Sequence, residues 1–292
     1  MDEKEKKSLG IRDAIIIGSI IVAVSIIIGA YIVSSSLSNI SLASGQGTTS
    51  QLQTYISTLQ TEPLPNITNI DPVYGNPNST NVIVYEYSDY ACPFCDEFYL
   101  ETFPSIYQNY IQTGQISWVY KVFPLYSIHP YANITSQYLT TIYELYGFNT
   151  WEEFTNWSWY NQLQGVTWDG FSNQTAVYEA FNSEAQNLGL NVSLIDAYIN
   201  NMTYYPVIYN SETNAIDTYG IDATPSFIIA VKTSNINYSE ISSVENELNS
   251  LKQYGLSYSV YKTPDGNYIM FQFAGALPYS FFSNILGPLT QG

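Results

Sequence analysis

The chain is poor in cysteine, histidine and charge. Its 292 residues include two cysteines, one histidine and 11% charged residues, of which 8 are basic and 25 acidic. Two cysteines exclude a disulfide-stapled scaffold, and one histidine leaves too few soft ligands for a closed zinc site, so we expect no metal and no cofactor. The net charge of −17 argues against binding to nucleic acid. Aromatic residues make up 16% of the chain, which indicates a packed domain rather than disorder.

The start of the chain contains an uncharged apolar run at residues 14–33. Its 20 residues would span about 30 Å as a helix, the thickness of a bilayer's hydrocarbon core. Four of the eight basic residues precede it, which favours a cytoplasmic N-terminus at residues 1–13. A cleaved signal peptide is the alternative, but its apolar region has only about 7–15 residues. We therefore predict a transmembrane signal anchor, a single-pass location in the cell membrane, and the remaining residues on the extracytoplasmic side.

The stretch after the predicted anchor, residues 34–80, is rich in Ser, Gln, Thr, Asn and Pro and lacks sustained periodicity. It predicts a linker that holds a folded domain away from the membrane. Nine N-x-[ST] motifs follow the anchor and predict an exported glycoprotein. The motifs begin at Asn39, Asn66, Asn78, Asn133, Asn156, Asn173, Asn191, Asn201 and Asn237.

From residue 81 the pattern alternates between strands and helices. Short β-branched and aromatic runs predict strands, and helical spacing of apolar residues predicts helices. The predicted strands lie at 82–87, 116–123, 227–231, 257–262 and 268–273. The predicted helices lie at 92–111, with a kink near Pro104, in several pieces between about 130 and 220, at 240–254 and at 278–286. This order predicts a layered α/β domain at 81–292 with a helical insertion at about 130–220.

Both cysteines lie where the first strand gives way to a helix, in the sequence Cys92-Pro93-Phe94-Cys95. The free N–H groups and positive dipole end of a helix start favour a thiolate, the nucleophile of disulfide exchange. We expect Cys92 to be the exposed attacking thiol and Cys95, one turn deeper, to resolve the mixed disulfide. Half of a zinc site, a structural disulfide or a buried free pair are the alternatives. The strand-to-helix setting favours redox function.

Four motifs in this chain resemble those of the DsbA-type thiol–disulfide oxidoreductases of the thioredoxin superfamily. They are Glu86-Tyr-Ser-Asp-Tyr-Ala-Cys92-Pro-Phe-Cys95, Lys121-Val-Phe-Pro-Leu125 followed by His129 and Ala132, Gly220-Ile-Asp-Ala-Thr224-Pro225-Ser-Phe-Ile, and Gly275-Ala-Leu-Pro278. The resemblance covers roughly residues 80–290. It implies a thioredoxin-like fold with a helical insertion.

The resemblance also implies roles for single residues. Cys92 would be the nucleophile and Cys95 the resolving thiol. Glu86 matches a buried acid that assists proton transfer at the inner sulfur; the alternative is an edge-strand carboxylate in water. Thr224 and Pro225 match a loop whose proline is cis and faces the active-site disulfide, where the Thr224 backbone would meet an extended substrate chain.

The helical block before Pro225 separates this family from plain thioredoxin and implies an apolar wall that accepts unfolded clients. Its aromatic residues are more often simple core, and His129 a hydrogen-bonded structural residue. The aromatic residues are Trp151, Phe154, Trp157 and Trp159. Residues 232–262 depart from the family pattern and predict an added helix and strand.

The residues around the cysteines also depart from the strongly oxidising members. The dipeptide between them is Pro-Phe rather than Pro-His, so one source of thiolate stabilisation is missing. The nearby carboxylates of Asp89, Asp96 and Glu97 would raise the thiol pKa further. We therefore predict a couple less oxidising than the value of about −120 mV for DsbA.

The low lysine content and a pI near 4.1 resemble exported proteins of acidophilic crenarchaea, an archaeal source in which an acid medium would neutralise these carboxylates. The predicted function is disulfide formation in exported, reduced proteins, with reoxidation by a membrane partner of the DsbB or vitamin-K-epoxide-reductase type. A reductase or isomerase with the same site, a redox-silent tethered peptide-binding module and a Cu(I) carrier are the alternatives.

Overall fold

The computed structural model describes residues 49–163 and 173–291, which belong to one compact unit. The predicted membrane anchor at residues 14–33 lies outside them. Among the described helices, none combines the length and the apolar character needed to cross a bilayer.

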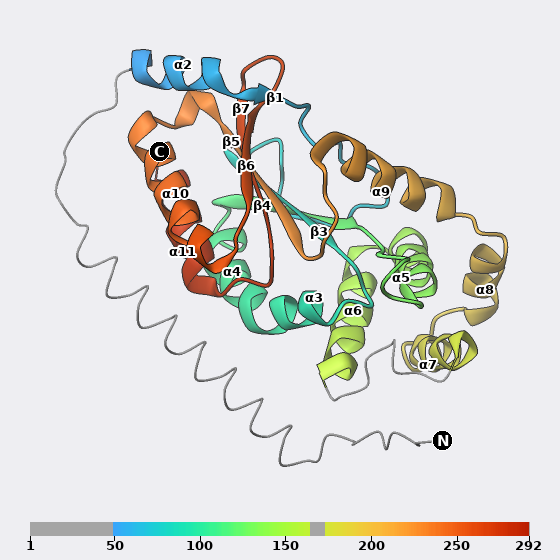
Figure 1. Cartoon of the computed structure of the whole chain (residues 1–292). Helices are drawn as coiled ribbons and strands as arrows, with labels where there is room; N and C mark the ends of the chain where they lie inside the picture. The colour runs from blue at the N-terminus through green and yellow to red at the C-terminus, as the bar shows by residue number, and fades with distance from the viewer. Residues whose placement is uncertain (1–48, 164–172, 292) are drawn as a thin grey trace, which may run out of the picture. The chain divides into compact units, whose positions relative to one another are not determined.

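Within the described residues, seven strands form one mixed sheet in the order β1-β6-β7-β5-β3-β4-β2 (Figure 1). The strands are β1 (Gln60–Thr61), β2 (Val73–Tyr74), β3 (Val82–Ser88), β4 (Ile116–Val122), β5 (Ser226–Lys232), β6 (Tyr258–Lys262) and β7 (Tyr268–Ala274). β3 pairs parallel with β4 and antiparallel with β5. All seven residues of β3 are buried, because this central strand is covered on both faces. The two short strands β1 and β2 lie at opposite edges of the sheet.

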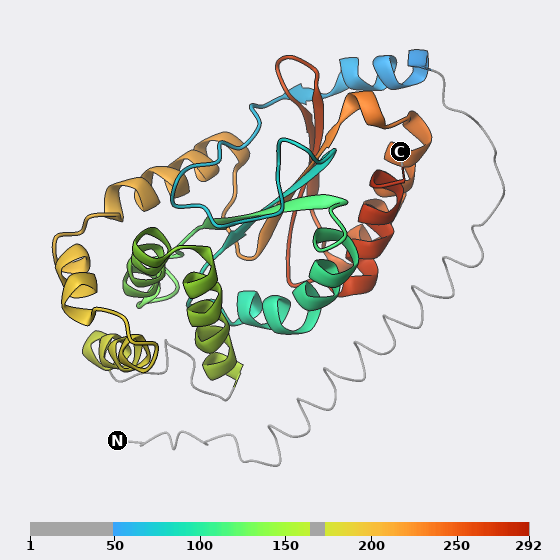
Figure 2. The same cartoon turned by 180° about the vertical axis from the view of Figure 1, so that it is seen from behind.

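Helices cover both faces of the sheet (Figures 1 and 2). They are α2 (Thr49–Thr58), α3 (Pro93–Glu97), α4 (Phe103–Ile106), α5 (Ala132–Tyr146), α6 (Phe148–Leu163), α7 (Gln174–Asn187), α8 (Val192–Asn200), α9 (Tyr205–Tyr219), α10 (Tyr238–Ser250) and α11 (Tyr279–Leu289). The larger core packs residues of α3, α4, α6, α10 and α11 against one face. The smaller core packs α9 against the other.

The helical insertion is confirmed as α5 to α9, between β4 and β5. Trp151, Phe154 and Trp159 are fully buried and Trp157 packs against them from a partly buried position, so these aromatic residues belong to the core. The added helix and strand after β5 are also present, as α10 and β6.

The helix that carries the cysteines continues to Ile111 as predicted, although its hydrogen-bond pattern changes along the way. Segments of π-helix, Phe98–Thr102 and Tyr107–Ile111, flank the short α4. Pro104 lies in the first turn of α4, where a missing N–H is tolerated, so the proline does not end the helix.

The prediction of a linker is wrong for residues 49–80, because this segment is part of the folded domain. Leu52 and Ile56 of α2 are buried one turn apart, and Tyr55 Oη donates a hydrogen bond of 2.9 Å to Glu245 Oε1 on α10. β1 pairs with β6 and β2 pairs with β4. The polar composition of the segment did not reveal the few apolar side chains that anchor it, nor its two strand pairings. Residues 34–48 lie outside the described residues.

Candidate active site

Both cysteines lie where β3 ends and α3 begins. Cys92 is the N-cap of α3 and Pro93 follows in its first turn. The turn before them is held by Asp89, whose backbone oxygen accepts from the Cys92 N–H at 3.0 Å and whose Oδ1 accepts from the Ala91 N–H at 2.8 Å. The backbone thus fixes the first sulfur at the mouth of the helix.

The two thiols have opposite acidities. A hydrogen bond from Cys95 lowers the pKa of Cys92 to about 6, against the opposing effect of burial, with further help from Thr224 and the Cys95 backbone. Burial, and then the neighbouring Cys92 sulfur, raise the pKa of Cys95 well above its ordinary value. Near neutral pH the pair therefore holds its negative charge on Cys92 and its proton on Cys95. This is the division of roles that disulfide exchange requires of an attacking and a resolving thiol.

The prediction that Cys92 is exposed is wrong, because only 2% of the residue is accessible. Its Sγ lies 3.5 Å from the Thr224 backbone oxygen, to which the protonated thiol donates, so the sulfur faces the neighbouring loop rather than solvent. Between the two cysteines, Pro93 and Phe94 are exposed, Phe94 to 60%.

The loop that covers the sulfur contains a cis peptide bond between Thr224 and Pro225, as the resemblance implied. The Pro225 oxygen accepts from the Gly275 N–H at 2.8 Å, which ties the loop to the end of β7. Two segments about 130 residues apart, the cysteine motif and this loop, thus meet at one point.

Glu86 lies deep beneath the cysteines, 1% exposed. Because its strand β3 lies between β4 and β5, the alternative of a water-exposed carboxylate on an edge strand is excluded. Burial raises the pKa of Glu86 to about 7, and hydrogen bonding from Trp118 and Ser88 opposes the rise. Trp118 Nε1 donates to Glu86 Oε2 at 2.9 Å. A carboxyl group with this pKa exchanges protons readily near neutral pH.

Of the carboxylates predicted to raise the thiol pKa, Asp89 and Asp96 interact with the charge of Cys92, and they do so unequally. Asp89 raises the pKa of Cys92, but this is the smallest of the effects on that thiol, so the pKa remains low. The Asp89 carboxylate also accepts from the Leu125 N–H and contacts His129 Nδ1, each at 2.8 Å. His129 is thus a buried structural partner, as predicted. Burial raises the pKa of Asp96 to about 7, with the Cys92 charge as the next cause.

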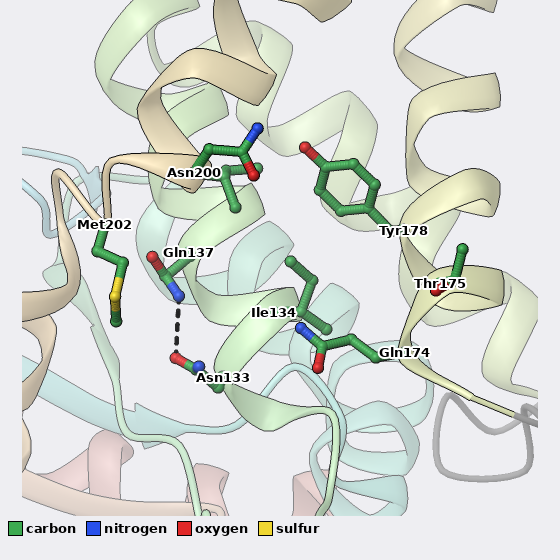
Figure 3. A pocket seen from close by; sticks show the side chains of 9 residues that line it. Asn133, Ile134, Gln137, Gln174, Thr175, Tyr178, Asn200 and Met202 are labelled. Atoms are coloured by element: carbon green, nitrogen blue, oxygen red, sulfur yellow. Dashed lines mark hydrogen bonds between the residues drawn. The ribbon is translucent and has the colours of Figure 1, made fainter.

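A separate open pocket of about 430 Å³ lies in the helical insertion (Figure 3). Its uncharged lining comes from α5, α7, α8 and Met202, and Gln137 Nε2 donates to Asn133 Oδ1 across part of it at 3.0 Å. The elements that hold the cysteines, Glu86 and the proline loop contribute nothing to this lining. The pocket is therefore distinct from the cysteine site.

Comparison with models of known protein families shows which family the chain belongs to. The family model described as thioredoxin matches residues 68–244, more than half of the sequence. The chain belongs to the thioredoxin family. The match begins well before residue 81, in agreement with the corrected domain boundary. A comparison with curated protein sequences finds no match.

Solved structures show the same fold. The chain is similar to alpha-DsbA1 of Wolbachia pipientis, with 20% identity and a TM-score of 0.54 over 78% of this chain and 93% of that one. Matches with lower TM-scores include BdbD of Bacillus subtilis, with 17% identity and a TM-score of 0.48 over 59% of this chain and 87% of that one. DsbA of Chlamydia trachomatis has 17% identity and a TM-score of 0.45 over 65% of this chain and 96% of that one.

Family membership and the cysteine geometry together identify this thioredoxin-family protein as a thiol–disulfide oxidoreductase with a DsbA-type fold. Three residues with polar side-chain groups around Glu86 were not among the predicted site residues: Ser88, Trp118 and Tyr120. Strand alternation was the available signal, since Ser88 lies two residues after Glu86 and shares its side of β3.

Proposed function

We propose that this oxidoreductase forms disulfide bonds in exported proteins through its Cys92-Pro93-Phe94-Cys95 motif. The observation that carries the proposal is the opposite shift of the two thiol pKa values, down for Cys92 and up for Cys95. A stable Cys92 thiolate is a good leaving group, which favours transfer of the disulfide to a client.

The proposed reaction transfers two electrons from the client to the enzyme. A client thiolate attacks the Cys92 sulfur of the oxidised pair, and Cys95 departs and takes a proton from Glu86. A second client thiolate then attacks the client sulfur of the mixed disulfide and releases the Cys92 thiolate. The client gains a disulfide, and the reduced pair returns its two electrons to a membrane reoxidase of the DsbB or vitamin-K-epoxide-reductase type.

In this proposal the client lies across the exposed Phe94 and the Thr224–Pro225 loop. The Thr224 oxygen already accepts from the Cys92 sulfur, so a client that displaces this contact would bring its own backbone to the same place. Movement of the loop is needed because Cys92 is only 2% exposed.

We further propose that residues 14–33 anchor the protein in an archaeal cell membrane with the catalytic domain on the extracytoplasmic side. The uncharged 20-residue run and the N-x-[ST] motifs support this placement. Six asparagines of these motifs lie at exposed positions, where an attached glycan would reach solvent. They are Asn66, Asn78, Asn156, Asn173, Asn191 and Asn201.

Trapping of clients tests the proposal. Cys95→Ala in the full chain removes the resolving thiol, so we expect disulfide-linked Cys92–client adducts that non-reducing gels and mass spectrometry detect. Cys92→Ala is the control and should form none. Equal absence of adducts in both variants would favour the redox-silent peptide-binding module.

A further inference from the structure

Three buried polar atoms without ordinary hydrogen bonds lie beneath Cys95. They are Glu86 Oε1, Ser88 Oγ and Tyr120 Oη, and none makes a hydrogen bond of ordinary geometry within the described part of the chain. Trp118 occupies the other oxygen of Glu86, so Oε1 is the free one. Buried polar atoms are usually paired, and a group of unpaired ones at a reactive centre requires an explanation.

The sheet brings these residues together. Glu86 and Ser88 are two residues apart on β3, so their side chains point to the same face. Tyr120 of β4 is directly paired with Glu86 in the parallel register. On this face, β3 and β4 contribute to the same core cluster as both cysteines.

The Ser88 hydroxyl is the group that the others share. Its hydrogen bonding lowers the pKa of Glu86, of Cys95 and of Tyr120. None of these three contacts has the geometry of an ordinary hydrogen bond. The Ser88 hydroxyl therefore lies near Glu86, Cys95 and Tyr120 without a fixed hydrogen bond to any one of them. A hydroxyl both donates and accepts, and this one is completely buried, away from competing solvent.

We propose that Ser88 relays the proton between the Cys95 sulfur and the Glu86 carboxyl group. When Cys95 leaves as a thiolate, it takes the Ser88 hydroxyl proton while Ser88 takes the proton of Glu86. When Cys95 attacks a mixed disulfide, the same transfers run in reverse and Glu86 Oε1 receives the proton. No electron is moved by the relay, and Ser88 regains its proton in each direction. The proposal rests on the proposed function of Cys95 as the resolving thiol.

A purely structural role of Ser88 and a proton relay predict different effects of Ser88→Ala. Loss of a structural contact would lower the stability, whereas loss of a relay would slow a chemical step. An unpaired buried hydroxyl contributes little stability, so replacing Ser88 by alanine should leave the melting temperature unchanged or higher. Loss of a relay should instead slow one chemical step. Ser136 on α5 offers a matched control, because its hydroxyl is also buried and without a hydrogen bond in the described part of the chain.

The test follows the reduced full-length protein as it reacts with glutathione disulfide, by acid quench and mass spectrometry. The first phase forms the Cys92–glutathione adduct, and the second is the attack of Cys95. For Ser88→Ala we expect an unchanged first phase and a second phase slower by at least about tenfold, with its inflection near pH 7 lost. Ser88→Thr keeps a hydroxyl and should restore the rate, and Ser136→Ala should match the wild-type protein.

An unchanged second phase in Ser88→Ala, or an equal slowing in Ser136→Ala, would overturn the relay. A wild-type protein that shows no second phase would instead overturn the proposed function itself. If Ser88→Ala fails to fold, the wild-type solvent isotope effect decides. Transfer through a hydroxyl moves two protons and predicts a curved dependence of the second-phase rate on deuterium fraction, whereas a straight line contradicts the relay.

Discussion

The Cys92 sulfur keeps a pKa of about 6 although burial and the Asp89 charge both raise it. Contacts with the Cys95 thiol and the Thr224 side chain lower this pKa and outweigh them. The pKa values of helix-start thiols run from about 3.5 in DsbA to about 7 in thioredoxin, so that of Cys92 lies between the two. The pKa of Cys92 is therefore lowered by contacts within the motif and the facing loop, rather than by an imidazole.

We expect the reduction potential of the Cys92–Cys95 couple to lie above the thioredoxin value of about −270 mV and below the DsbA value of about −120 mV. Titration against glutathione buffers measures it. Asp89→Asn removes the charge that opposes the thiolate, so it should lower the pKa of Cys92 and make the couple more oxidising. A potential at or above the DsbA value contradicts the prediction, and one near the thioredoxin value would favour the reductase alternative.

At the scale of elements, α2 contributes to the fold although its composition indicated a linker. Leu52 is 5% exposed on a helix whose Tyr55 reaches α10, 190 residues further along the chain. We expect Leu52→Ala to lower the free energy of unfolding by about 2–4 kcal/mol, because it removes buried apolar surface and leaves a cavity. Gln53→Ala, on the exposed side of the same helix, is the matched control. Chemical denaturation of both variants checks this, and equal stability would mean that α2 is only loosely attached.

The elements that the sequence predicted well are those with strong local patterns. The buried run at β3 and the short piece at β4 each lie within one residue of their predicted ends, and Thr224–Pro225 is cis as the family motif implied. The burial of Cys92 could not be predicted, because the loop that covers it is about 130 residues away in the sequence. The same holds for α2 and β1, whose residues are mostly polar and whose partners are distant, and for β2, whose two residues are too few to form a pattern.

On the scale of the whole molecule, several carboxyl groups with raised pKa values favour folding in acid. Burial raises the pKa of Glu86 and of Asp96 to about 7, and those of Glu97, Glu212 and Glu247 in the same direction. A carboxyl group whose pKa is higher in the folded than in the unfolded state favours folding when protonated. Its contribution is complete below the unfolded pKa of about 4 and is lost as the pH rises through the folded value.

We therefore expect the melting temperature to be highest in acid and to fall between about pH 4 and pH 8, with roughly 3 kcal/mol of the loss due to Glu86. Calorimetry across this range measures it. Glu86→Gln cannot ionise and should show a shallower decline. Stability that instead rises from pH 5 to pH 8 would contradict the burial-driven shifts, and with them the expected origin in an acidic habitat.

The short strands β1 and β2, at opposite edges of the sheet, would matter if the proposed clients are unfolded polypeptides. A long unpaired sheet edge exposes backbone N–H and C=O groups to which an extended chain can bind. A client bound there could start aggregation. Here the edge strands β1 and β2 have only two residues each and come from one stretch of the chain, so each presents few backbone groups for pairing. Under the proposed function, a client would therefore bind at the cysteine end rather than along the sides of the sheet.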